Sequence, residues 1–357
     1  MLSFHNVEQY KENQTVFDLV LMSIVSTYVG QPLHIHVEGV RGTGKTTIMR
    51  TAKHILPKIT RIKGCVYNCD PSAPHCPEHK GMTPEEIKEL GVEETTMPFL
   101  EISHSSKTGT VVGSIDLEKL TDSMYPEARL LPGIVPQAHR GIIFIDEINR
   151  LADTSPEITD VLLDVMGNKP GHLQIEEAGL PVVDLPVSLS VWAASNPDEA
   201  PGALEWVRRQ LSDRFDMVCS IGRPSSVEVL SRILKKNSFY YKSRHKSKVK
   251  IDDANYGILT KKITKWGRAY KTAELTDYLR NYISQLYVNY KFESLRAAEA
   301  IEQAVLLYSI IKGHDRVLTS DINQIIPMIL KHRIGENALN ELIRKMEGKD
   351  SNSAEGI

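Results

Sequence analysis

The sequence has no long apolar run, almost no net charge and few cysteines. We therefore expect no membrane span, and residues 1–8 lack the basic and then apolar pattern of a signal peptide, so a cytoplasmic protein is expected. With a formal net charge of −2, binding to nucleic acid or anionic lipid would require a local patch. Three of the four cysteines fall in one short segment, which favours a metal or redox feature over a disulfide framework.

The chain does contain a phosphate-binding motif. Residues 39–46 read Gly-Val-Arg-Gly-Thr-Gly-Lys-Thr and fit G-x-x-x-x-G-K-[ST], between a strand pattern at 33–38 and a helix pattern at 47–55. The glycines let backbone N–H groups surround a β-phosphate, the lysine reaches the β- and γ-phosphates, and the final threonine completes a Mg²⁺ shell. The alternative is a chance glycine-rich surface turn. We predict a nucleotide site at Gly39, Arg41, Gly42, Thr43, Gly44, Lys45, Thr46 and Thr47.

Polar side chains follow two further apolar strands. The run 141–145 is uninterrupted, as in a strand buried on both faces of a parallel sheet, and ends in Asp146 and Glu147. Asp146 is predicted to hold Mg²⁺ through water, and Glu147 to orient or deprotonate the attacking water. A second buried strand, 188–195, ends at Asn196, which is placed to contact the γ-phosphate or that water. The alternatives are an ordinary acidic strand end and an Asn-Pro turn.

The cysteine segment has the spacing C-x₃-C-x₆-C-x₂-H, formed by Cys65, Cys69, Cys76 and His79 in a loop expected at 62–80. Its short final spacing suits a tetrahedral zinc site. The alternative is a set of reduced thiols in a loop, with His75 and His79 merely solvated.

The remaining patterns predict the surrounding elements. With 357 residues, the chain is long enough for two domains. A capping box at 154–157 is expected to begin the helix 157–166, and 104–135 is expected to be a protruding loop with a short helix at 117–120. Further expected elements are helices at 16–28, 82–90, 275–290, 293–312 and 320–332, strands at 99–102 and 217–220, and a hairpin at 173–187.

Together these motifs resemble the AAA+ ATPases of the magnesium chelatase subunit I and MoxR group. The match lies in order and spacing: the P-loop, residues 112–116 with 131–134, the run 141–147, residues 195–197 and residues 211–215. The cysteine segment also resembles one in some bacterial chelatase subunits. The resemblance implies an α/β core with a parallel sheet flanked by helices at 1–225, a C-terminal α-helical lid at 226–345 and a flexible tail at 346–357.

The resemblance also implies roles for residues. Asn196 would be sensor 1, Arg214 the arginine finger acting on a neighbouring subunit's ATP, and Arg296 sensor 2. Arg209 matches a further arginine of the same segment. The N-terminal segment lacks the Gly-Gln pair usual before the first helix in chelatase subunits, so no adenine pocket is assigned.

The function implied is an oligomeric, hexameric motor that uses ATP and Mg²⁺. With a von Willebrand A-type partner, it would drive metal insertion into a tetrapyrrole or remodel a protein complex. The alternative is a helicase-like nucleic-acid machine, for which the basic stretch 235–250 offers a contact but the near-neutral charge is unfavourable.

Overall fold

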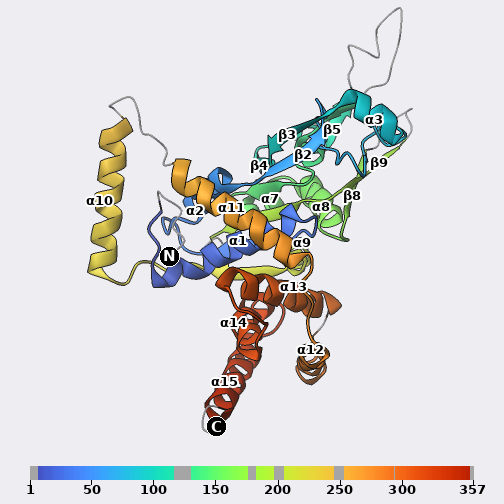
Figure 1. Ribbon diagram of the computed structural model, residues 1–357. Coiled ribbons are helices and arrows are strands. Elements are labelled where there is room, and N and C mark those ends of the chain that lie inside the picture. The colour runs from blue at the N-terminus through green and yellow to red at the C-terminus, as the bar shows by residue number, and fades with distance from the viewer. Residues whose placement is uncertain are drawn as a thin grey trace, which may run out of the picture. The chain divides into compact units, whose positions relative to one another are not determined.

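The described part of the chain contains a five-stranded parallel sheet together with many helices, drawn in Figure 1 from blue at the N-terminus to red at the C-terminus. The computed structural model describes residues 7–115, 130–175, 182–196, 205–244, 253–292 and 294–353. The strand order is β11 (Met217–Ser220), β1 (Ile35–Glu38), β10 (Ser190–Ser195), β7 (Ile142–Ile145) and β4 (Phe99–Ile102). Pairing is parallel between β1 and β11, β10 and β7, and β4 and β7. Every residue of β7 and β10 is buried, as their apolar runs predicted. The α/β class is confirmed.

The chain divides into two compact units. One contains residues 1–29, 35–55 and 215–357, and the other contains 30–34 and 56–214. The domain boundary expected after residue 225 stays a prediction. β11 pairs with β1, and α1 (Gln14–Tyr28) packs on α11 (Asp253–Tyr270) and α13 (Leu295–Lys312), so the N-terminal elements group with the C-terminal helices.

Besides β1 and β11, the first unit consists mainly of helices. The expected helices are present as α1, α12 (Asp277–Asn289), α13 and α14 (Thr319–Leu330). The helix expected at 47–55 is α2 (Lys45–Thr51) followed by a 3-10 turn (Ala52–Ile55), and a further 3-10 turn (Lys11–Asn13) precedes α1. The remaining helices are α10 (Val227–Arg244), α11 and α15 (Glu336–Ser353). α15 continues into the segment expected as a flexible tail from 346, because its apolar positions Leu339, Leu342 and Met346 are buried.

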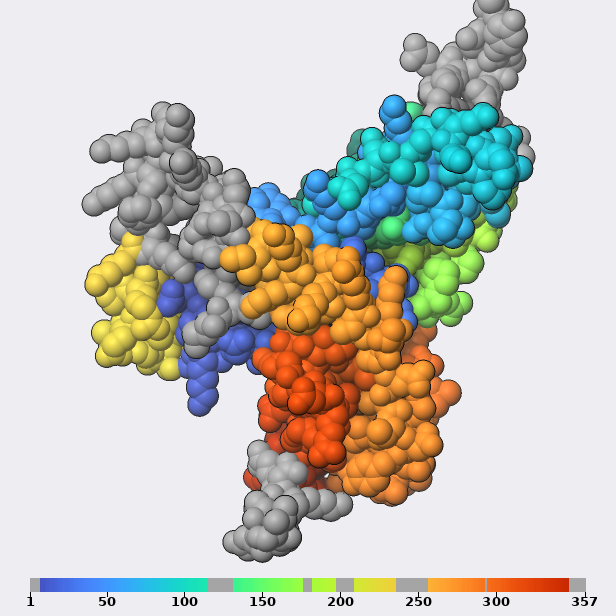
Figure 2. Space-filling view, viewed as in Figure 1, coloured from blue at the N-terminus to red at the C-terminus, as the bar shows by residue number. Residues whose placement is uncertain are grey.

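The second unit carries the cysteine segment, and the stretch of chain that contains this segment is drawn in blue to cyan in Figure 2. The segment lies between β2 (Lys58–Ile62) and α3 (Pro84–Leu90), and β2 pairs antiparallel with β3 (Val92–Thr96). The expected hairpin is β8 (Gly171–Ile175) with β9 (Val183–Val187). After β7, this unit contains α7 (Ile148–Thr154), α8 (Pro156–Val165) and α9 (Glu205–Arg214).

Two expectations need correction. The segment 104–135 is not simply a loop: it contains α4 (Thr108–Val112), α6 (Ile134–Gln137) and an antiparallel pair of β5 (Gly113–Ile115) and β6 (Leu130–Pro132). A Cβ on Gly133 would lie 2.5 Å from the carbonyl oxygen of Val111, so small residues here permit close packing, which the sequence shows only as loop formers. The helix expected at 117–120 lies outside the described residues.

The capping box expected at 154–157 is also wrong, although the helix is present. Thr154 ends α7, and Ser155 occupies the N-cap of α8 without a side-chain capping bond. The Thr154 hydroxyl instead donates to the carbonyls of Arg150 (2.9 Å) and His104 (3.0 Å). A preceding helix has taken the residue that a local pattern assigned to the cap.

Candidate nucleotide-binding site

The predicted P-loop joins β1 to α2, as a phosphate-binding loop must. Gly42 and Gly44 adopt φ values of 78° and 88°, which side-chain-bearing residues rarely adopt. Gly39 is required for another reason: a Cβ there would lie 2.5 Å from Ile221 Cγ2 and 2.8 Å from the Ile221 carbonyl oxygen. The strand, loop and helix expected at 33–55 are therefore present, and the glycines shape a loop with room for a phosphate group.

Lys45 lies within this loop. Its side chain is buried, and Nζ donates to the carbonyl oxygens of Gly39 and, over 3.0 Å, Val40. Thr43 Oγ1 donates to the same Val40 carbonyl over 2.9 Å. These bonds hold an ammonium group at the start of α2, where the helix dipole also favours an anion. Arg41 and Thr47 are exposed and Thr46 is partly buried.

A cavity of about 330 Å³ opens beside the P-loop, within the same unit. Its size falls in the range of small-molecule sites. The sequence assigned no such pocket, because its walls come from segments about two hundred residues apart. The lining residues are Val7, Glu8, Tyr10, Asn13, Gly42, Thr43, Gly44, Thr47, Ile48, Pro224, Leu230 and Ile233.

Polar contacts fix the N-terminal wall of this cavity to the segment after β11. Arg232 Nε donates to Glu8 Oε1 over 2.7 Å, and the Tyr10 hydroxyl donates to the Gly222 carbonyl over 3.3 Å. Ser225 additionally donates to the Glu12 carboxylate. The cavity thus combines apolar and polar wall residues next to a phosphate-type loop, which suits the base and ribose of a nucleotide.

A short cluster of contacts also joins the C-terminal end of α14 to β1, which precedes the P-loop, and to β11, which pairs with β1. Lys331 donates to Glu38, the residue before Gly39, and to Ser220 at the end of β11. Arg333 donates to the carbonyls of Phe215 (2.8 Å) and Asp216 (3.1 Å). No local sequence pattern predicts this cluster, which links the end of α14 to the residue before the P-loop.

The predicted acidic residues follow β7 in the second unit. Glu147 takes the left-handed conformation, with φ 54° and ψ 51°, and caps α7. For a residue with a side chain this conformation is strained, and such strain is concentrated at functional sites. Asp146 and Glu147 are partly buried, and Arg150 Nη1 donates to Glu147 Oε2 over 2.7 Å. Asn196 is buried directly after β10.

The predicted arginines lie at helix ends. Arg214 is the last residue of α9, and its guanidinium lies against Gly167, where an added Cβ would come within 3.2 Å of Nη1. Arg209 is exposed on the same helix. Arg296, in the first turn of α13, donates its backbone N–H to the N-cap Ser294 over 3.2 Å. Arg296 shares a unit with the P-loop, whereas Asp146, Glu147, Asn196 and Arg214 share the other.

The cysteine segment forms one buried cluster. One ligand atom each from Cys65, Cys69, Cys76 and His79 lies within 4.8 Å of the others. Hydrogen bonds from the Cys69 and Cys76 side chains lower the pKa of Cys65, because they favour its thiolate. The spatial grouping that the spacing predicted is present, and the loop alternative of separately solvated residues is not.

Comparisons with known proteins place the chain in a family. The model of the magnesium chelatase subunit ChlI matches residues 28–205, and that of the AAA lid domain matches 280–351. A magnesium-chelatase subunit ChlI-2 of Arabidopsis thaliana is 27% identical over 90% of this chain and 73% of its own. The magnesium-chelatase 38 kDa subunit of Acidiphilium rubrum is 26% identical over 85% of this chain and 84% of its own.

A solved structure, a putative ATPase from Cytophaga hutchinsonii, shares the fold with a TM-score of 0.56 and 16% identity, over 95% of this chain and 89% of its own. The fold, the loop and the two matched domains define an AAA+ ATPase, an ATP hydrolase. Within that class, the chain belongs to the magnesium chelatase subunit I family. Among the described residues, no helix is both long and apolar enough to cross a membrane.

Proposed function

We propose that this chain is the ATP-hydrolysing motor of a magnesium-chelatase-type enzyme, which drives metal insertion into a tetrapyrrole. The observation that carries the ATPase part is Lys45, held inside a glycine loop beside a cavity of about 330 Å³. The chelatase part is supported by relatives aligned along nearly the whole chain, whose names are those of magnesium chelatase subunits.

The proposed site combines residues from several strand ends. Ligands of open α/β sheets bind at the carboxyl ends of the strands. The P-loop follows β1, Asp146 and Glu147 follow β7, and Asn196 follows β10. Lys45 and the loop N–H groups bind the phosphates, and Thr46 with Asp146 would hold the Mg²⁺ that accompanies ATP and neutralises phosphate charge.

Glu147 then accepts a proton from, or orients, the attacking water, as its position after β7 suggests. Asn196 donates to the γ-phosphate or that water, and Arg296 reaches the γ-phosphate as the sensor 2 residue. The cavity walls hold the base, so affinity for nucleotide and turnover rest on different residues.

The proposal includes a ring, most simply a hexamer, in which Arg214 acts on the neighbour's ATP. An arginine at the end of α9 stabilises charge that develops on a γ-phosphate outside its own P-loop, a contribution of about 10³–10⁵ in rate in related chemistry. The second chain of the enzyme is proposed to be a von Willebrand A-type partner, and the relatives' description as subunits agrees with a partner in general terms.

Zinc has no part in the proposed reaction. A metal at Cys65, Cys69, Cys76 and His79 would be structural, because four protein ligands leave no open position for a reacting group. The cytoplasmic location expected from the sequence stays a prediction.

Tetrapyrrole metallation is the discriminating experiment. The partner protein is first isolated by its binding to immobilised Glu147→Gln in the presence of ATP, and immobilised Lys45→Ala is the control. The wild-type chain is then combined with the isolated partner, ATP, Mg²⁺ and a soluble porphyrin. Insertion changes the porphyrin's visible absorption, and we expect it only with hydrolysable ATP and the wild-type chain. ATP hydrolysis without insertion would instead favour remodelling of a protein complex. Salt-sensitive DNA binding that stimulates hydrolysis would favour the nucleic-acid alternative.

A further inference from the structure

We propose that Cys65, Cys69, Cys76 and His79 bind one structural Zn²⁺, and that the residues around this site fasten it to the starts of strands β7 and β10. The inference is independent of the proposed ATPase reaction. All four side chains are buried, and one ligand atom from each lies within 4.8 Å of the others. In a tetrahedral zinc site with bonds of about 2.0–2.3 Å, ligand atoms are about 3–4 Å apart. The cluster needs only a small contraction to reach that geometry.

Backbone N–H groups already point at the sulfur atoms. The N–H groups of His75 and Cys76 each lie 3.4 Å from Cys69 Sγ, and that of Cys69 lies 3.5 Å from Cys65 Sγ. Such donors stabilise thiolates, the form in which cysteine binds a metal. Two N–H groups that converge on the Cys69 sulfur favour its thiolate form, as metal binding at this cluster requires.

The geometry also separates the two histidines. His79 Nδ1 lies 3.0 Å from Cys76 Sγ and belongs to the ligand cluster. His75 Nδ1 lies 3.2 Å from Cys69 Sγ, but its ring stacks on His139, with centroids 3.7 Å apart and planes 25° apart. His75 is therefore a positioning residue, whose Nδ1 shares a hydrogen bond with the Cys69 sulfur while its ring packs on His139. Outer partners of this kind orient metal ligands.

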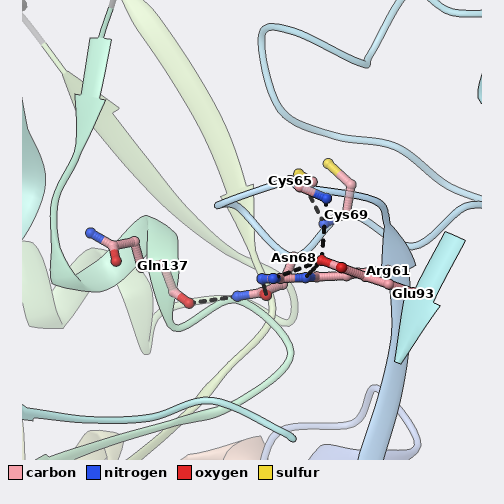
Figure 3. A network of polar contacts seen from close by, with 7 residues as sticks. Arg61, Cys65, Asn68, Cys69, Glu93 and Gln137 are labelled. Atoms are coloured by element: carbon pink, nitrogen blue, oxygen red, sulfur yellow. Dashed lines mark hydrogen bonds and ion pairs between the residues drawn. The ribbon is translucent and has the colours of Figure 1, made fainter. Parts of the chain in front are cut away.

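The loop that carries the ligands is fastened to the segment before β7 (Figure 3). Asn68 Nδ2 donates to the Gln137 carbonyl over 2.7 Å, and Arg61 Nη1 donates to Asn68 Oδ1 over 2.8 Å. A second link is the ion pair of Arg140 with Asp70 at 3.0 Å. Both links leave the ligand atoms free to bind a metal.

The same segment is bonded to the start of β10. His139 Nδ1 accepts from the Ser188 N–H over 3.1 Å, the Arg140 N–H donates to the Ser188 carbonyl over 2.6 Å, and the Ser190 N–H donates to the Gly141 carbonyl over 3.0 Å. The strands fastened here are those that end in Asp146, Glu147 and Asn196. Metal binding is therefore expected to stabilise the amino-terminal ends of these strands.

Metal analysis of protein purified without added zinc is the first test. We expect about one zinc per chain in the wild type, below about 0.2 in Cys65→Ser, Cys76→Ser and His79→Ala, and about one in Cys219→Ser, a buried cysteine of β11 outside the cluster. His75→Phe should also retain about one zinc, because it keeps an aromatic ring against His139 and removes only the nitrogen that contacts Cys69.

Two further measurements do not depend on the folding of the ligand variants. Metal-stripped wild type titrated with Co²⁺ should develop thiolate charge-transfer absorption and the intense visible bands of tetrahedral coordination. Asn68→Asp keeps an oxygen that accepts from Arg61 and tolerates the φ of 52°, but it loses the N–H donor to the Gln137 carbonyl. This variant should still bind zinc, but zinc should raise its melting temperature less than that of the wild type.

The proposal would be overturned by wild-type protein with less than about 0.2 zinc and no such cobalt absorption, or by an intact mass that shows a disulfide among these cysteines. An equal melting-temperature gain from zinc in Asn68→Asp would overturn the fastening to β7. None of these readouts depends on ATP hydrolysis, so failure here is distinct from failure of the proposed function.

Discussion

The carboxylate of Glu147 is paired with the guanidinium of Arg150, whose Nη1 lies 2.7 Å from Glu147 Oε2. The two residues are three apart, and Glu147 caps the helix that carries Arg150 in its first turn. Both side chains are roughly half exposed, at 39% and 52%, and pairs of this kind contribute about 0–1 kcal/mol. Arg150 therefore competes weakly with a water molecule for the proposed base.

Arg150→Ala should raise kcat for ATP by up to about five-fold and leave the nucleotide Kd unchanged, because it removes only this competing contact. Steady-state hydrolysis and nucleotide titration check both values, with the exposed Arg316→Ala as control. A fall in kcat of about ten-fold or more would mean that Arg150 positions Glu147 for the reaction.

Arg333 should be important for stability through its bonds to two successive carbonyls. Arg333→Met removes the charged donors to the carbonyls of Phe215 and Asp216, although His332 Nε2 also lies 3.0 Å from the Phe215 oxygen, and should lower the free energy of unfolding by about 1–3 kcal/mol. Thermal unfolding should show a drop of about 3–10 °C, with almost no change in the exposed control Arg316→Met. Equal melting temperatures for the two variants would show that these contacts contribute little.

His36 should make the protein less stable at mildly acidic pH. Burial lowers the pKa of His36 from 6.5 to about 4, an effect that Glu38 opposes and Lys331 reinforces. The unfolded chain takes up a proton near pH 6.5 that the folded chain accepts only near pH 4, so the free energy of unfolding falls as pH is lowered through that window.

Denaturant unfolding between pH 4 and 7 measures this effect. His36→Leu should reduce the slope of the free energy of unfolding by up to about 1.4 kcal/mol per pH unit. Parallel pH profiles for wild type and His36→Leu would contradict the buried, neutral state of His36.

The proposed sharing of Arg214 between subunits predicts complementation. Arg214→Ala should bind ATP nearly normally and hydrolyse it very slowly, and Lys45→Ala should not bind it. In a mixed ring, an Arg214→Ala subunit keeps its P-loop and receives Arg214 from a Lys45→Ala neighbour. Titrating the two variants at fixed total protein should therefore restore part of the activity. Zero activity throughout, despite proven mixed rings, would place the action of Arg214 within its own subunit.

Sequence reasoning succeeded where the determining interactions are local. The glycines and lysine of 39–46 and the buried runs of β7 and β10 carry their conformation in the pattern itself, and the four residues of the Cys/His cluster lie close in sequence. It failed where distant residues decide. The cavity joins Tyr10 to Ile233, and no local pattern reveals it. Likewise, Thr154 has the composition of a capping residue, but α7 extends through it.

The central claim is that the P-loop binds ATP while Glu147 acts only in its hydrolysis, and paired titrations of Lys45→Ala and Glu147→Gln test it most directly. Nucleotide affinity and single-turnover hydrolysis are measured on both, after equal melting temperatures show that both are folded. Lys45→Ala should lose binding, because it removes charge from the ground-state phosphates. Glu147→Gln should keep wild-type affinity while kcat falls by about 10²–10⁴. Equal loss of affinity in both variants, or full turnover by Glu147→Gln, would contradict the account.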